Sequence, residues 1–302
     1  MNMKKIFLTL TSLVSFTLFS QAPTIQWAKC FGGSNYESAN SIVQTVDGGY
    51  IFAGHSRSTN GDVSANYGNN DYWIVKIDDI GGIEWQRTYG GNGDNQLYVI
   101  HQTQDGGYIA GGNSNSTTTL TSLGGTVSNG TDYWVIKMDE NGTIVWSETY
   151  DFGKVDILTS LVENEDRTIL IGGYAQNESS HSLEKGLKKD EEGINDYIAL
   201  KIDEKGEVLW DKSVGSEGED ILRKLITTRD GGYLMAGTSN AQSASGPCGP
   251  CNNGSNTCAN IITLSASNSN DQSGFASFTV NCVNVGFAGQ CIDLSVKRTE
   301  IN

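Results

Sequence analysis

Acidic residues recur at one place in the sequence, nine or ten residues after each of four tryptophans. They are Glu37, Asp94, Asp156 and Asp220. Two neighbouring carboxyl groups can cleave a glycosidic bond, one as acid and the other as base or nucleophile. A residue that returns in every copy of a repeat is more typical of a hydrogen bond that the fold requires. The pattern therefore favours structural carboxylates over catalytic ones.

Other catalytic signatures are missing from the sequence. The three histidines, His55, His101 and His181, occupy different positions relative to the repeat. The chain has no Gly-x-Ser-x-Gly elbow for a nucleophilic serine and no glycine loop that ends in Lys-Ser or Lys-Thr to hold phosphate. We therefore expect no catalytic residue and no residue that binds an organic cofactor.

One loop has the composition of a calcium site. Asp62, Asn66 and Asp71 alternate with other polar residues in the segment Asp62–Asp71. Calcium prefers such carboxylate and amide oxygens. The alternative is a turn rich in Asp and Asn that binds no metal, and the equivalent segment of the next repeat lacks the first acid.

Cysteines are concentrated in the last fifth of the chain. Cys248-Gly-Pro-Cys251 has the spacing of a thioredoxin active site, but no strand precedes it and no helix follows. Zinc is a second interpretation, and the absence of a nearby histidine argues against it. Disulfides are favoured in an exported chain. The candidates are Cys30, Cys248, Cys251, Cys258, Cys282 and Cys291, with Cys30 as the odd residue that could tie an N-terminal strand to the tail.

The elements that would position these groups come from a sequence repeat. Each copy closes on a tryptophan, at Trp27, Trp85, Trp146 and Trp210. Asp-Gly-Gly-Tyr begins at Asp47, Asp105 and Asp230, with a degenerate copy at Asp166, and Asp-Tyr-(Trp/Ile) begins at Asp71, Asp132 and Asp196. Three marks in one register indicate a repeated structural unit.

The most regular part of each unit is a hairpin, Lys-(Ile/Met)-Asp-x-x-Gly-x-(Ile/Val)-x-Trp. It occurs three times without a gap. The aspartates can accept backbone N–H groups in the turn, and the glycines can supply its positive φ. These residues are Asp78, Asp139 and Asp203 with Gly81, Gly142 and Gly206.

The apolar residues of each unit fall into four short runs bounded by Gly, Asn and Ser, which predict four strands. We therefore expect an all-β fold, a β-propeller of four recognisable units that is small or partial, with a tail that contains cysteines. One tryptophan per unit would fill the wedge between adjacent blades. Insertions between the second and third strands predict variable loops on one face.

The predicted divisions are a signal peptide over 1–20, propeller repeats over 21–240, and 241–302 as either a divergent last blade or a disulfide-stapled β tail. Residues 1–20 carry two lysines and then a short apolar run, which is typical of a secretory signal. The formal net charge is −15, spread along the chain, which argues against nucleic acid as a partner. We expect a secreted or cell-surface protein, with the periplasm as an alternative location.

The hairpin resembles the repeat of pyrroloquinoline-quinone-type propellers over about ten residues per unit. A fuller resemblance is to exported tandem-repeat propeller proteins of Bacteroidota, over residues 25–240. Trp27-Ala-Lys-Cys-Phe-Gly-Gly33 and Asp47-Gly-Gly-Tyr-Ile-Phe-Ala-Gly54 are similar to their unit. The resemblance implies an extracellular propeller, often exported by type IX secretion, and no defined reaction.

The sequence thus favours a binding or structural module without catalysis. Its expected partner is a polysaccharide, a protein or another copy of the chain. The alternative is a propeller enzyme that acts on glycans or uses a quinone-type cofactor. Four units would give a ring narrower than a quinone site uses.

Overall fold

The computed structural model describes residues 25–117, 130–177, 195–215, 219–229, 231–239 and 258–264. The predicted signal peptide, Asp230, and four of the six cysteines lie outside these residues. The chain divides into two compact units, Met1–Cys30 and Phe31–Asn302. All the described strands belong to the second unit.

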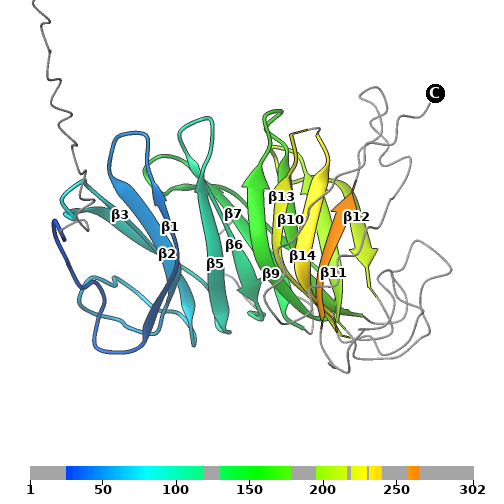
Figure 1. The fold of residues 1–302 in the computed structure, drawn as a ribbon. Helices are drawn as coiled ribbons and strands as arrows, with labels where there is room; N and C mark the ends of the chain where they lie inside the picture. Colours follow the sequence, from blue (N-terminus) through cyan, green and yellow to red (C-terminus); the bar gives the residue numbers. More distant parts are fainter. Residues whose placement is uncertain are drawn as a thin grey trace, which may run out of the picture. The chain divides into compact units, whose positions relative to one another are not determined.

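The second unit contains four antiparallel sheets, so the prediction of an all-β fold is confirmed (Figure 1). The first sheet consists of β1 (Glu37–Gln44), β2 (Tyr50–Ser56), β3 (Asp71–Ile77) and β4 (Ile83–Tyr89). The second consists of β5 (Asn95–Gln102), β6 (Tyr108–Ser114), β7 (Asp132–Met138) and β8 (Ile144–Tyr150). The third consists of β9 (Gly153–Glu163), β10 (Ile169–Asn177), β11 (Asn195–Ile202) and β12 (Val208–Val214). The fourth, as described, consists of β13 (Asp220–Thr227), β14 (Tyr233–Ser239) and β15 (Cys258–Leu264).

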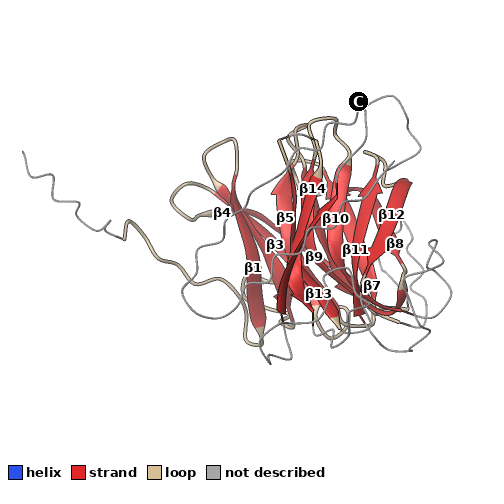
Figure 2. Cartoon of the chain, turned by 45° about the vertical axis from the view of Figure 1, so that its right-hand side comes forward, coloured by secondary structure: helices blue, strands red, loops and turns tan. Residues whose placement is uncertain are grey.

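Within each sheet the strands follow one another in chain order. Figure 2 shows strands and loops across the described residues, which include no helix able to cross a membrane. The third strands are the most apolar, and every residue of β3 and β7 is buried. A short continuous apolar run of this kind is typical of a strand that is covered on both faces.

The sheets pack on one another through their first strands. β5 contacts β1 and β2, β9 contacts β5 and β6, and β13 contacts β9 and β10. Each interface encloses a separate apolar cluster. The second and third sheets each have a neighbouring sheet on both faces, so their central strands are buried.

Three of the repeated tryptophans lie where neighbouring sheets meet. The ring of Trp85 packs against Tyr108 of the next sheet at 5.9 Å between centroids, and Trp210 packs against Tyr233 at 5.8 Å. Trp146 donates from Nε1 to the carbonyl of Glu204, at 2.9 Å. These rings fill the wedge between sheets, as one large side chain per unit can do.

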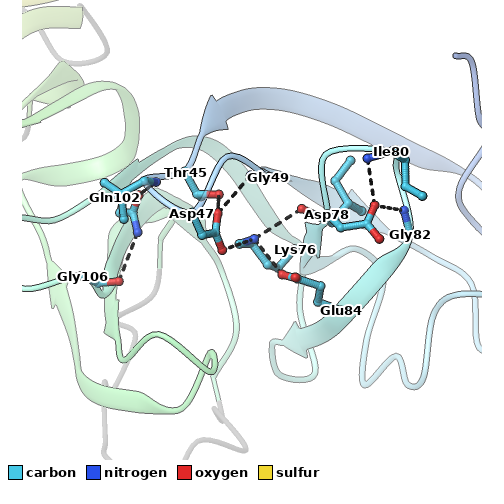
Figure 3. Close-up of polar contacts among 12 residues, drawn as sticks. Thr45, Asp47, Gly49, Lys76, Asp78, Ile80, Gly82, Glu84, Gln102 and Gly106 are labelled. Atoms are coloured by element: carbon cyan, nitrogen blue, oxygen red, sulfur yellow. Dashed lines mark hydrogen bonds and ion pairs between the residues drawn. The ribbon is translucent and has the colours of Figure 1, made fainter. Parts of the chain in front are cut away.

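The repeated Asp and Gly shape the turn between the third and fourth strands. Asp78 accepts hydrogen bonds from the backbone N–H groups of Ile80 and Gly82, at 3.0 and 2.6 Å (Figure 3). Asp139 and Asp203 each accept two N–H groups in the same way. The φ angles of Gly81, Gly142 and Gly206 are 79°, 78° and 89°, which favour glycine.

The fourth sheet begins its third strand earlier than the sequence indicated. The thirty-residue step from Asp166 to Asp196, applied to Asp230, predicts this strand at position 260. β15 instead begins at Cys258, which pairs with Ser239 of β14 and takes the place of the repeated aspartate. The prediction was wrong because the preceding connection varies in length from repeat to repeat. Residues 275–280, whose sequence predicts a closing strand, lie outside the described residues.

The N-terminal strand expected around Trp27 is not formed. Residues 25–36 contain no strand, and Trp27 is exposed. In the other units this segment is a fourth strand, which pairs with the third strand that precedes it in the chain. Cys30 is exposed and forms no disulfide within the described residues. Its candidate partners Cys248, Cys251, Cys282 and Cys291 lie outside those residues, so a disulfide to the tail stays a prediction.

Candidate functional site

Each sheet has two different ends. The turn end carries the tight turns that join the first to the second strand and the third to the fourth. The loop end carries the long connections between the second and third strands, such as 57–70, and the passages into the next sheet, such as 90–94. The ionisable groups that the sequence singled out fall at one end or the other.

At the turn end, the repeated lysine pairs with the aspartate of Asp-Gly-Gly-Tyr. Lys76 Nζ lies 2.8 Å from Asp47 Oδ2 and 2.7 Å from Glu84 Oε2 (Figure 3). Lys137 lies 2.8 Å from Asp105. The hydrogen bond from Lys76 lowers the pKa of Asp47 to about 2. These groups fasten the turns of one sheet to each other, which is a structural use of charge.

The three residues of the predicted calcium loop lie at the loop end of the first sheet. Asp62 accepts a hydrogen bond from the Gly32 N–H at 2.9 Å. Asn66 uses its amide as a donor, to the Ser56 carbonyl at 2.9 Å. Asp71 accepts from the Tyr67 N–H at 2.5 Å. Their side chains thus hold the loop in shape, and calcium binding by this set stays a prediction.

Asp71 also belongs to a contact between sheets, here called the first junction, which consists of Asp71, Gly90, Asn95 and Ser114. The backbone N–H of Asn95 donates to the Asn70 carbonyl at 2.8 Å, which sets the start of β5 beside the start of β3. The Asn95 amide then donates to Asp71 Oδ1 at 3.1 Å. Burial raises the pKa of Asp71 to about 6.

The amide oxygen of Asn95 is satisfied as well. It accepts hydrogen bonds from Ser114 Oγ at 2.5 Å and from Ser116 Oγ at 2.9 Å. Gly90 completes the arrangement, because a Cβ at this position would lie 1.9 Å from Asp71 Oδ1. The first junction is therefore one carboxyl group surrounded by neutral donors, with a glycine that leaves room for it.

The equivalent contact between the second and third sheets, here called the second junction, consists of Asp132, Asp151, Asp156 and Ala175. The Asp156 N–H donates to the Thr131 carbonyl at 2.6 Å, and Thr131 and Val155 form an isolated bridge. This bridge sets the start of β9 beside the start of β7. Carboxylate oxygens of the three aspartates lie within 4.8 Å of one another.

Two of the three aspartates at the second junction are buried, and the third is exposed. Asp132 is 1% exposed and Asp156 is 0% exposed, whereas Asp151 is exposed. Asp156 accepts from the Phe152 N–H at 2.5 Å through Oδ2, and its Oδ1 is buried with no hydrogen-bond partner. Burial, together with the charges of Asp132 and Asp151, raises the pKa of Asp156 to about 8.

The structure changes the grouping of the recurring acids. Asp94 was taken as the equivalent of Asp156, but the residue at that position of β5 is Asn95, ten residues after Trp85. Glu37, at the start of β1, accepts from Ser56 Oγ at 2.9 Å, and Asp220 is buried at the start of β13. Sequence reasoning missed Asp151. The sequence does contain a signal for it. Asp151 follows Tyr150, whereas a glycine follows Tyr89 and Val214 at the equivalent positions of the other repeats.

The sequence matches no protein-family model and no curated protein. Among solved structures, it is similar to a protein of unknown function from Dyadobacter fermentans, with 13% identity over 77% of this chain and 67% of that one, at a TM-score of 0.43. It is also similar to a protein of unknown function from Bacteroides caccae, with 14% identity over 58% of this chain and 67% of that one, at a TM-score of 0.21.

Proposed function

We propose that the chain is a secreted or cell-surface β-propeller module that binds an extracellular polysaccharide or protein through its loop end and acts without catalysis. The antiparallel meanders that pack face to face through their first strands support the propeller arrangement. The repeated ionisable groups support the absence of catalysis, because Lys76, Asp47 and Asp78 are engaged in holding turns.

The observation that carries the binding proposal is a pair of exposed tyrosines at the loop end of the first sheet. Tyr67 lies in the connection between β2 and β3 and is 47% exposed. Tyr36 immediately precedes β1 and is 55% exposed. Tyrosine offers a rigid apolar ring with a polar tip, which suits both sugar and protein surfaces.

Variation along the chain points to the same end. The turns at Asp78, Asp139 and Asp203 keep one pattern, whereas the connections 57–70 and 115–131 differ in sequence and length. Binding residues commonly lie on variable loops that a regular scaffold positions. The loop end is therefore the better candidate for a binding surface.

The binding proposal can be tested with a panel of immobilised bacterial and plant polysaccharides and with outer-surface protein extracts. Tyr36→Ala and Tyr67→Ala should weaken the binding that the unaltered chain shows by about tenfold or more, as truncation of an interface aromatic does. Ile80→Ala is the matched control, since Ile80 is 65% exposed at the turn end. Equal binding by the tyrosine variants and the unaltered chain would overturn the proposal, and so would a chain that binds nothing in the panel.

One candidate carboxyl pair for the enzyme alternative lies at the second junction. A glycosidase places both carboxyl groups against the scissile bond. Asp132 and Asp156 are buried among the strands, and only Asp151 is exposed. A sugar ring would reach at most one of the three carboxyl groups, so binding is the better supported function.

A further inference from the structure

We propose that the second junction binds one calcium ion through Asp132, Asp151 and Asp156, and that this ion ties the second sheet to the third at the loop end. The proposal concerns residues other than Asp62, Asn66 and Asp71, and it does not depend on the function proposed above.

The first junction shows the same contact with its polar groups joined by hydrogen bonds. Three positions differ in the second junction. Asp156 stands where the first junction has the amide of Asn95, and Asp151 stands where it has Gly90. Ala175 stands where it has Ser114, since Ser114 pairs with Asn95 and Ala175 pairs with Asp156. Two changes add a carboxylate and the third removes a hydroxyl donor.

These changes leave a buried oxygen atom without a protein partner. In the first junction, the Asn95 oxygen accepts two serine hydroxyls. In the second junction, Oδ1 of Asp156 is buried and accepts nothing. An unsatisfied buried carboxylate oxygen is costly unless a cation or a proton compensates it. Asp156 belongs to the same cluster as Asp132 and Asp151, and the charges of those two residues raise the cost by repulsion.

The third junction, between Asp196 and Asp220, provides a second comparison. It keeps the glycine, because a Cβ at Gly215 would lie 1.8 Å from Asp196 Oδ1. The described residues therefore bring three acidic side chains together at the second junction and at no other place. The third carboxylate is that of Asp151, which replaces the glycine of the other two junctions and is exposed to solvent.

The spacing of the oxygens suits calcium. Calcium binds carboxylate oxygens at about 2.4 Å, so two ligands of one ion lie at most about 4.8 Å apart. The three carboxylates already meet this limit. Magnesium keeps several of its waters and usually takes only one or two carboxylates, so three carboxylates in one site favour calcium. The exposed Asp151 gives the ion a path from solvent, and water would complete its coordination shell.

The position of the ligands indicates what the ion would do. Asp132 begins β7 of the second sheet, Asp151 follows β8, and Asp156 lies in β9 of the third sheet. An ion shared by these residues would join the second sheet to the third. At the first junction, hydrogen bonds from neutral donors join the first sheet to the second at the equivalent place. The ion would also fix the base of the connection 115–131 next to the passage into β9. We therefore expect calcium to stabilise the folded chain.

The test is calorimetric titration of the metal-free chain with calcium chloride and, separately, with magnesium chloride. We expect one calcium ion per chain, with an affinity in the range of extracellular calcium modules, about 10⁻⁴–10⁻³ M or tighter, and with weaker binding of magnesium. Thermal unfolding with and without calcium provides a second readout. Calcium should raise the melting temperature.

Two variants and one control assign the site. Asp151→Gly restores the residue found at Gly90 and Gly215, so it should fold, and it should bind calcium at least tenfold more weakly. Asp156→Asn restores the amide of Asn95 and should lose both the binding and the thermal shift. Asp62→Asn is the matched control, and it should bind as the unaltered chain does.

Three results would overturn the proposal. One is the absence of calcium binding by the unaltered chain at millimolar calcium. Another is binding that Asp62→Asn abolishes and Asp151→Gly leaves intact, which would place the ion in the loop of the first sheet. The third is magnesium binding as tight as calcium binding, which would contradict the argument from the number of carboxylates.

Discussion

Restoring a serine at position 175 should stabilise the metal-free protein. Ala175 pairs with Asp156 as Ser114 pairs with Asn95, so a serine there would direct its hydroxyl at the buried oxygen that has no partner. The position is 2% exposed, and serine adds one oxygen atom to alanine. The same residue type already fits at the equivalent position of the first junction.

The expected gain follows from the hydrogen bond. A pKa of about 8 keeps Asp156 mostly protonated at pH 7, so the new bond joins neutral groups. Such a bond contributes about 0.5–1.5 kcal/mol, and fitting an extra atom into a packed site subtracts part of it. We expect Ala175→Ser to increase the free energy of unfolding by about 1 kcal/mol without metal. This corresponds to about 2–4 °C in melting temperature for a chain of this size.

The assay is urea unfolding in the presence of a chelator, followed by tryptophan fluorescence. Ser114→Ala is the mirror-image control, because it removes a hydroxyl from the Asn95 oxygen and should destabilise by about 1 kcal/mol. In saturating calcium the gain from Ala175→Ser should shrink, since the ion would already satisfy the oxygen. A destabilised Ala175→Ser variant in chelator would refute our interpretation of the second junction as a repeat contact that has lost its donor.

Three further predictions concern the scaffold. Because hydrogen bonds from Lys76 and Lys137 hold the pKa of Asp47 and Asp105 at about 2, below the ordinary 3.8, their contribution to stability is present above about pH 4 and is lost as the pH falls through about 2. Both carboxylates are half exposed, so Asp47→Asn should cost at most about 1 kcal/mol at pH 7 in urea unfolding, and progressively less as the pH falls below about 4. Trp146→Ala should cost about 2–4 kcal/mol, because it empties a wedge between sheets and frees the Glu204 carbonyl, whereas Trp146→Phe should cost less; equal losses would argue against packing as the cause. Gly142→Ala should cost more than Gly106→Ala in the same assay, since both have a positive φ but only the Cβ at 142 would lie 2.9 Å from the Trp85 ring; equal costs would show that the ring moves aside freely.

The hairpin was the part of the fold that the sequence predicted best. Asp78, Gly81 and Trp85 keep fixed spacing because one tight turn determines all three positions. The alternation of short apolar runs with Gly and Asn likewise predicts strands. These features are local, so the residues involved lie within ten positions of one another.

Contacts between units were harder to predict. A repeat shows that Asp132 and Asp71 are equivalent, but it does not show that each meets the first strand of the next sheet. That meeting depends on backbone bonds such as Asp156 to Thr131, which exist only once the sheets stack. Asp94 was chosen in place of Asn95 because the two residues are adjacent and only one is acidic. The start of β15 at Cys258 was missed for a similar reason, since strand pairing sets it and the length of the connection does not.

The second junction differs from the first at three positions, and a bound ion would explain all three. The most direct measurement is an anomalous difference map from a crystal of the chain grown with calcium. We predict one peak at about 2.3–2.6 Å from carboxylate oxygens of Asp132, Asp151 and Asp156. A map with no peak among these three side chains, or with its peak beside Asp62, would contradict the account.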